Sequence, residues 1–90
     1  MARQLPKISI VVPVLNEAGA IENTLGNLIR DGIEVIVVDG GSSDKTLDVI
    51  SRHPCKVLES AAGRACQMNK GAEAASGDIL LFLHADTILP

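Results

Sequence analysis

The stretch that decides the fold is Ile79 to Pro90, ILLFLHADTILP, in a chain of 90 residues. Its first five residues, Ile79 to Leu83, are all apolar, and the polar cluster His84-Ala85-Asp86-Thr87 follows at once. A short apolar run fits a strand buried on both faces or a buried helix segment, and the flanking glycine and proline favour the strand. In open α/β sheets, ligands bind beyond the carboxyl ends of the strands. We therefore expect Asp86 at a ligand or metal site.

Three earlier segments are also predicted to be strands, because β-branched and aliphatic residues dominate them. These segments are Ile8–Val14, Val35–Val38 and Lys56–Glu59. Apolar residues at helical spacing predict a helix in each interval between strands. Strands that alternate with helices imply an α/β fold, β-α-β-α-β-α-β, with a parallel sheet and helices on both of its faces.

Polar residues that can cap a helix predict where the first two helices begin. Asn16 is expected to cap the first helix, and Ser43 or Asp44 the second. The third helix is predicted from Arg64 to Ala75. Its inward stripe would consist of Ala65, Met68, Ala72 and Ala75, small enough to let the helix lie close to the sheet.

Composition narrows the class of protein. Apolar residues make up 47% of the chain and charged residues 21%, as in a globular domain. Phe82 is the only aromatic residue and the net charge is -3, which argues against a nucleic-acid binder that stacks bases or neutralises phosphates. Cys55 and Cys66 lack metal-site spacing, so buried free thiols are favoured over a disulfide. With no signal peptide and no apolar run of about 20 residues, we expect one soluble cytoplasmic domain, residues 1–90.

Each predicted strand ends in polar residues: Asn16 and Glu17, then Asp39 and Asp44, then Glu59 and Ser60, then His84 and Asp86. Neighbouring parallel strands lie about 4.8 Å apart, so these strand ends can converge on one crevice. Carboxylates there could hold a divalent cation, and the cation a diphosphate. Asp39 could bind a ribose hydroxyl or a base, or could instead close its own turn. The chain has neither GxGxxG nor GxxxxGK[ST].

Three motifs in this order resemble the nucleotide-sugar-binding half of family 2 glycosyltransferases with the GT-A fold. They are VVPVLNE, VIVVDGGSSDKT and GRACQMNKGAEAASGDILLFLHADT, and the resemblance extends from Ile8 to Pro90. The ending LHADT-x-LP is also similar to a bacterial subgroup called selenodomain-associated transferases. The resemblance implies a Rossmann-like sheet with strand order 3-2-1-4. It also implies transfer of a sugar from a nucleoside-diphosphate sugar to an acceptor that the sequence does not define.

The resemblance further implies a substrate site made of Pro13, Asn16, Glu17, Asp39, Gly40, Arg64 and Asp86. The first three would line the nucleotide pocket, Asp39 would bind the base or ribose, and Gly40 would shape the pocket wall. Arg64 would approach the base or the diphosphate. Asp86 matches the last aspartate of the DxD motif, which contacts the ribose and a Mg²⁺ or Mn²⁺ ion. His84 stands at the first position of that motif and removes one hard oxygen ligand. No residue matches the family's general base, so the catalytic residue is left unknown.

Two other functions remain as alternatives. One is a sugar-phosphate nucleotidyltransferase, which the stretch LNEAGA disfavours because it carries no basic residue after the first strand. The other is a non-catalytic fragment that oligomerises. By resemblance, the strand of residues 79–83 lies at the sheet edge, where later segments would cover it in a complete enzyme. An uncovered apolar edge invites pairing, so we predict a homo-oligomer formed through this strand. Membrane association of a complete protein stays open.

Overall fold

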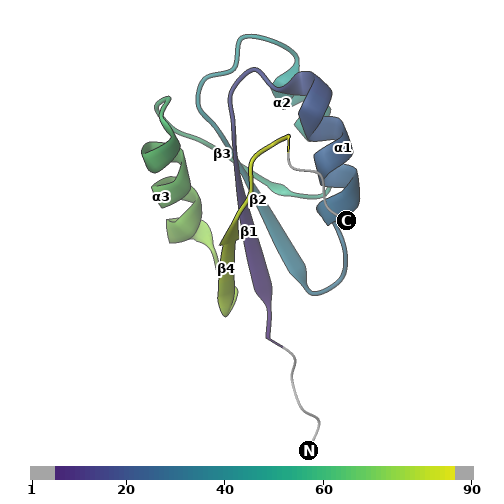
Figure 1. Ribbon diagram of the computed structural model, residues 1–90, viewed down its shortest axis with the longest axis vertical. Coiled ribbons are helices and arrows are strands. Elements are labelled where there is room, and N and C mark those ends of the chain that lie inside the picture. The colour runs from purple at the N-terminus through teal and green to yellow at the C-terminus, as the bar shows by residue number, and fades with distance from the viewer. Residues whose placement is uncertain (1–5, 87–90) are drawn as a thin grey trace, which may run out of the picture.

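The computed structural model of the protein describes residues 6–86. Its elements follow in the order β1 (Ile8–Val14), α1 (Ala18–Leu28), β2 (Ile33–Asp39), α2 (Thr46–Ile50), β3 (Lys56–Glu59), α3 (Arg64–Ala74) and β4 (Ile79–Phe82). The four strands are parallel, in the order β3-β2-β1-β4, which confirms the predicted fold class and strand order. Their carboxyl ends point to the top of Figure 1.

The sheet separates two apolar layers, because alternate residues of a strand point to opposite faces. From β1, Ile10 and Val12 pack with α1 and α2, whereas Val11 packs on the opposite face, with Ala74 of α3. Figure 1 shows α1 and α2 on one side of the sheet and α3 on the other. The prediction of helices on both faces is therefore confirmed.

The predicted inward stripe of α3 is confirmed only in part: Ala75 packs against the core, and Met68 and Ala72 are half-buried. The buried residues of this helix are Gln67 and Gly71, and Ala65 is exposed. A Cβ atom on Gly71 would lie 2.3 Å from Cγ1 of Val11, so the helix approaches the sheet at the one residue without a side chain. This close approach sets the rotation of α3, and Gln67, one turn earlier, is turned inward with Gly71.

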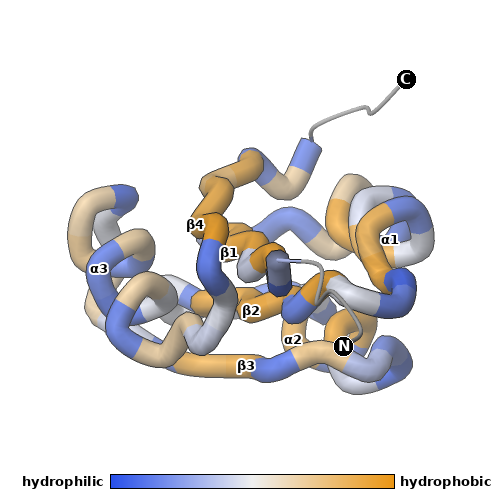
Figure 2. Tube along the Cα trace, turned by 90° about the horizontal axis from the view of Figure 1, so that it is seen from below, coloured by the Kyte–Doolittle hydropathy of each residue, from blue (hydrophilic) through white to orange (hydrophobic). Residues whose placement is uncertain are grey.

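The interpretation of the last strand as buried on both faces is wrong, whereas the edge position and the uncovered apolar surface implied by the resemblance are confirmed. Among the described residues, β4 pairs with β1 alone. Its side chains are 39 to 44% exposed, in Ile79, Leu80, Leu81 and Phe82. Figure 2 shows β4 coloured as hydrophobic on the outer side of β1. The residues after Phe82 turn toward α1, where Ala85 is buried and its carbonyl accepts a hydrogen bond from Thr24. Residues 87–90, the end of the motif LHADT-x-LP, lie outside the described part.

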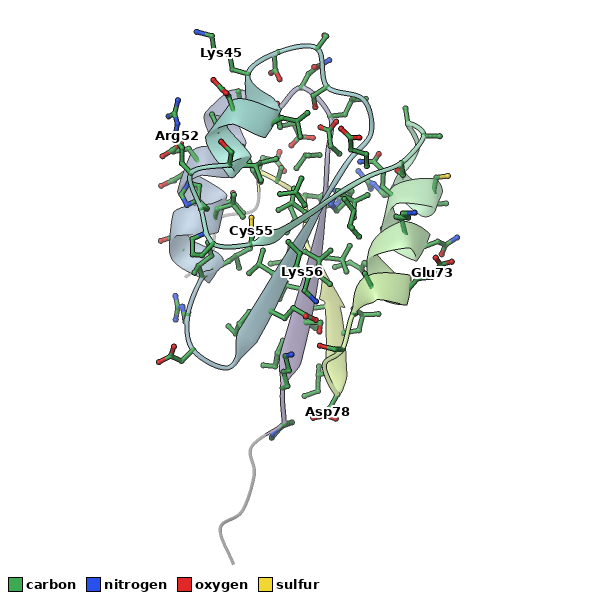
Figure 3. All side chains as sticks on the ribbon, turned by 180° about the vertical axis from the view of Figure 1, so that it is seen from behind. Lys45, Arg52, Cys55, Lys56, Glu73 and Asp78 are labelled. Carbon is green, nitrogen blue, oxygen red and sulfur yellow. The ribbon has the colours of Figure 1, made fainter. Side chains whose placement is uncertain are left out.

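At the opposite end of the sheet, Glu34 of β2 joins three strands. Its carboxylate accepts hydrogen bonds from the Ser9 hydroxyl (2.8 Å) and the backbone N–H of Ser76 (2.9 Å). The ammonium group of Lys56, labelled in Figure 3, reaches it from β3 at 2.7 Å. The Glu34 side chain is only 8% exposed, whereas the Lys56 side chain is 56% exposed, so the carboxylate is shielded while its cation remains open to water.

Two further sequence predictions concern the cysteines and the membrane. Cys55 and Cys66 are both free thiols, as predicted, but the predicted burial is wrong: Cys55 is half-buried, and Cys66, on the outer side of α3, is exposed. None of the helices found between residues 6 and 86 has the length and apolar character that crossing a membrane requires.

Candidate functional site

The loops that follow β1 and β2 are tied together by Asn16. Its side-chain oxygen accepts hydrogen bonds from the backbone N–H groups of Ser43 (2.7 Å) and Asp44 (3.3 Å). Its own N–H donates to the Ser42 hydroxyl at 2.9 Å, and its φ of 53° places it in the left-handed region, which asparagine tolerates. Because α1 begins at Ala18 and its cap makes no side-chain hydrogen bond, the predicted capping role of Asn16 is wrong. The side chain fastens one loop to the next.

Asp44 holds the first turn of α2 and touches the start of α1. Its carboxylate accepts hydrogen bonds from the N–H groups of Thr46 (2.9 Å) and Ala18 (3.5 Å). The Thr46 side chain is the main cause that lowers the pKa of Asp44 below its ordinary value. The same hydroxyl accepts the N–H of Glu17 at 2.8 Å. The formal cap position is Lys45, but the hydrogen bond expected of a capping residue is made by Asp44, one of the two predicted caps.

Asp39 ends β2 opposite Val14 of β1 and is 1% exposed. One carboxylate oxygen accepts the N–H groups of Gly41 and Ser42, each at 2.9 Å, and the other accepts the Ser42 hydroxyl. The carboxylate therefore closes its own turn, which is the alternative that the sequence left open. A carboxylate as buried as that of Asp39 needs these hydrogen-bond donors, because burying an unpaired carboxylate costs much free energy.

A hollow of about 220 Å³ opens at the carboxyl ends of the strands. Its wall includes Pro13 and Glu17 from the end of β1, Arg64 and Gln67 from α3, and His84 after β4. A second, apolar hollow of about 180 Å³ shares three of its lining residues with the first: Pro13, Arg64 and His84. The two hollows therefore adjoin, with Arg64 and His84 between them.

The charges around the first hollow act on Glu17. Burial is the largest cause and raises the pKa of its carboxyl above the ordinary value. The negative charge of Asp86 raises that pKa further, whereas His84 and Arg64 act in the opposite sense. Glu17, Arg64 and His84 line this hollow, and Asp86 follows His84 by two residues beyond the end of the same strand.

Gln67 is a part of the site that sequence reasoning missed. It is 4% exposed, and its amide nitrogen donates to the carbonyl oxygens of Val14 (2.9 Å) and Val38 (2.8 Å). A Cβ atom on Gly40 would lie 2.8 Å from the side-chain oxygen of Gln67, so Gly40 leaves room for it. A polar residue was not expected on the inward face of α3. The available signal was Gly71 four residues later, on the same face of the helix.

The structure thus divides the seven predicted substrate-site residues into two groups. Pro13, Glu17 and Arg64 line the hollow, and Asp86 acts on Glu17. Asn16, Asp39 and Gly40 belong to the turns behind the hollow and do not line it. Within residues 6–86, no three His, Cys, Asp or Glu side chains gather closely enough to hold a metal ion by themselves.

The sequence was compared with protein families and with known proteins. The profile of Glycosyl transferase family 2 matches residues 9–90. The chain is 35% identical to a PGL/p-HBAD biosynthesis glycosyltransferase of Mycobacterium tuberculosis, over 93% of this chain and 37% of the relative. It is also 35% identical to validoxylamine A glucosyltransferase of Streptomyces hygroscopicus, over 88% of this chain and 22% of the relative.

Solved structures are similar over the same range. A mannosyltransferase from Pyrobaculum calidifontis, in complex with GDP-Man and Mn²⁺, matches with a TM-score of 0.86 and 31% identity, over 94% of this chain and 29% of that chain. Glucosyl-3-phosphoglycerate synthase from M. tuberculosis, solved with Mn²⁺, UDP and its product, matches with a TM-score of 0.80 and 29% identity, over 92% and 34%. The chain spans between about a fifth and about two fifths of the length of these relatives. On the profile match, the chain belongs to glycosyl transferase family 2.

Proposed function

We propose that this chain is a single domain, residues 1–90, that binds the nucleoside-diphosphate sugar donor of a glycosyltransferase. The observation that carries the proposal is the hollow lined by Glu17, Arg64 and His84 at the carboxyl edge of a family 2 sheet, with Asp86 two residues after His84. Complexes of similar proteins with GDP-Man and with UDP support a nucleotide ligand. The whole protein would pass the sugar to an acceptor whose identity these residues do not define.

The role proposed for each residue follows from its position around the hollow. The carboxylate of Glu17, in the wall of the hollow beside Pro13, can accept hydrogen bonds from ribose hydroxyls. The guanidinium of Arg64 is a planar fork of N–H donors that suits diphosphate oxygens, and its charge would stabilise the departing nucleoside diphosphate. Asn16, Asp39 and Gly40 would act by fixing the turns that form the back of the hollow. No described residue is proposed as the general base.

Asp86 is the residue that would hold a divalent cation, Mg²⁺ or Mn²⁺. Its carboxylate, with that of Glu17 nearby, fits part of such a site, because Mg²⁺ is usually bound through one or two carboxylates together with substrate phosphates. His84 supplies no oxygen ligand, so the donor's phosphates and water would fill the remaining positions. Once bound, the cation would offset the negative charge that develops on the diphosphate.

Calorimetric titration of the chain with UDP and with GDP, each in the presence of Mn²⁺, tests the proposal. Saturable binding of at least one nucleotide is expected. Asp86→Asn should weaken it about tenfold or more, since a hydrogen bond or contact to a charged group is worth about 1.5–3 kcal/mol. Asp31→Asn, an exposed change in the turn before β2 at the opposite end of the sheet, is the matched control and should bind like wild type. No binding of either nucleotide at millimolar concentration would contradict the proposal.

We also propose that β4 pairs with its counterpart in a second copy of the chain. The other edge strand, β3, carries the charged residues Lys56 and Glu59, which discourage pairing. In contrast, β4 has no charged residue and its four side chains are exposed. A strand of this kind is suited to an antiparallel partner of the same sequence.

The other functions considered gain no support from the comparisons. The relatives described above include glycosyltransferases of two kinds, and no nucleotidyltransferase is among them. The subgroup of selenodomain-associated transferases and the cytoplasmic location stay predictions of the sequence.

A further inference from the structure

The carboxamide of Gln67 joins three elements at the carboxyl edge of the sheet. Its nitrogen donates to the carbonyl oxygens of Val14 in β1 and Val38 in β2. Its oxygen accepts the backbone N–H of Gly63, the residue that precedes α3, at 3.3 Å. An amide nitrogen has two hydrogens to donate, and both are used here. Gln67 is therefore not available to donate to a ligand, and any part it plays must come from what it holds in place.

The two strand carbonyls lie where β1 and β2 separate. Val14 pairs with Asp39 at the last register position, and the Val14 carbonyl also accepts the N–H of Gly40 at 3.0 Å. Beyond this point, β1 leads to Glu17 and β2 leads into the turn closed by Asp39. Gln67 thus connects α3 to the carboxyl ends of β1 and β2, where the loops that follow these two strands begin.

The start of α3 has little else to define it. No side chain caps this helix, and Gly63 has a φ of 133°, a conformation that other residues rarely adopt. The side-chain oxygen of Gln67 instead accepts the N–H of the N-cap residue Gly63, and so ties the start of the helix to its second turn. Arg64 is the first residue of α3, one turn before Gln67, and both line the same hollow.

We infer that Gln67 is a positioning residue that fixes Arg64 against the donor's diphosphate, an inference that rests on the proposed function. A guanidinium binds diphosphate oxygens best when its planar fork is held in one orientation. Without the Gln67 hydrogen bonds, the first turn of α3 is no longer held against the carboxyl ends of β1 and β2. Nucleotide affinity then falls although no group that touches the nucleotide has been removed.

The test compares Gln67→Met with wild type in nucleotide titrations with Mn²⁺, at a temperature where both are folded by circular dichroism. Methionine keeps the length of the side chain and donates no hydrogen bond. The Kd of the folded chain should rise about ten- to a hundredfold, the scale of a lost hydrogen bond to a charged group. A merely structural role would lower the melting temperature and leave this Kd unchanged. Glu73→Gln, on the same helix and pointing away from the sheet in Figure 3, is the control and should leave Kd unchanged.

Two further variants make the test specific. In an Arg64→Ala background, Gln67→Met should change Kd little, because Gln67 acts through Arg64. If Gln67→Met does not fold, Gly40→Ala displaces the same carboxamide, since the new Cβ would lie 2.8 Å from its oxygen, and should raise Kd in the same way.

The outcomes separate the inference from the function on which it rests. A wild-type chain that binds neither UDP nor GDP would overturn both. A wild-type chain that binds, combined with an unchanged Kd in Gln67→Met or Gly40→Ala, would overturn the inference alone. Full additivity of Gln67→Met and Arg64→Ala would do the same, because independent residues add and coupled residues do not.

Discussion

Gly71 is the residue at which α3 comes closest to the sheet. An added Cβ would lie 2.3 Å from Cγ1 of Val11 and 3.1 Å from Cγ2 of Val38, both from buried side chains. Interiors are close-packed, so neither valine has space into which it can retreat. The glycine is required here by packing and not by backbone conformation.

Gly71→Ala should therefore lower the free energy of unfolding by about 1–3 kcal/mol, the usual cost of overpacking a core. Gly26→Ala is the matched control, because Gly26 lies in α1 with open space around its Cβ position. There alanine should stabilise the protein by up to about 1 kcal/mol through its higher helix propensity. Urea unfolding measures both changes, and a Gly71→Ala variant as stable as wild type would contradict the packing described here.

At this scale the sequence predicted which residues carry polar chemistry, but not which partner each one has. Asn16 and Asp39 were correctly placed at the carboxyl ends of the first two strands, and both proved to bind backbone N–H groups of turns. Gln67 was missed because its partners, the carbonyls of Val14 and Val38, are far from it in sequence. Hydrogen-bond partners of this kind depend on how the elements pack and have no local signature.

Among the elements, β2 is held at its two ends by different chemistry. At its carboxyl end Asp39 closes a turn, whereas near its amino end Glu34 binds Ser9, Ser76 and Lys56. The contact with Lys56 is the largest cause that holds the pKa of Glu34 well below its ordinary value, followed by the N–H of Ser76 and the hydroxyl of Ser9. These bonds fasten β3 and the start of β4 to the centre of the sheet.

The stability of the fold should therefore depend on the ionisation of Glu34. Its folded-state pKa lies below the ordinary value of 4.5, so its contribution is present above that pH and is lost as the pH falls further. Glu34→Gln should cost about 1–3 kcal/mol at pH 7 and flatten the loss of stability below pH 4.5. Denaturant unfolding at a series of pH values measures this.

Glu22→Gln is the control for that experiment. Glu22 meets Arg52 at 4.0 Å and His53 at 3.7 Å, and its own side chain is 52% exposed. Exposed pairs contribute about 0–1 kcal/mol, so the control should follow wild type at every pH. An acid-stability profile of Glu34→Gln that matches wild type would contradict the role given to Glu34.

The strands were predicted well because β-branched and aliphatic residues dominate them. The ends of β1 and β3 agree with the sequence, whereas β2 begins two residues earlier and ends one residue later than predicted. The rotation of α3 was predicted only roughly, since alanines at spacings of three and four mark a face beside the one centred on Gln67 and Gly71. The exposed state of β4 could not follow from its own residues either. A wholly apolar strand is usually covered, and whether it is covered depends on chain elsewhere.

For the molecule as a whole, the parallel sheet is what brings distant residues together. Glu17 and Asp86 are far apart in sequence, yet the charge of one acts on the other. Alternating strands and helices, together with the family resemblance, were enough to predict this shared edge and its strand order. The hollows were not predictable, because they depend on how individual side chains leave space between the loops.

The same topology leaves β4 at an edge, and this has a consequence for assembly. Sedimentation of the 90-residue chain at high micromolar concentration should show a dimer or larger oligomer. Leu81→Lys, which places a charge on the edge strand, should shift the population toward monomer. The control is Glu73→Lys, which also introduces a lysine but at an exposed position of α3, away from the edge strand. This variant should assemble like wild type. A wild-type chain that sediments as a clean monomer would contradict the proposed pairing.

The measurement that tests the central claim most directly is a titration of the isotope-labelled chain with UDP or GDP and Mn²⁺, followed by the shifts of its backbone amides in NMR spectra. We expect saturable shifts at Glu17, Arg64, Gln67 and Asp86, which come from separate parts of the sequence and meet at the carboxyl edge. The amides of Lys7, Glu34 and Ser76, at the amino edge, should stay unchanged. Shifts confined to the amino edge, or no saturable shift at all, would contradict the account.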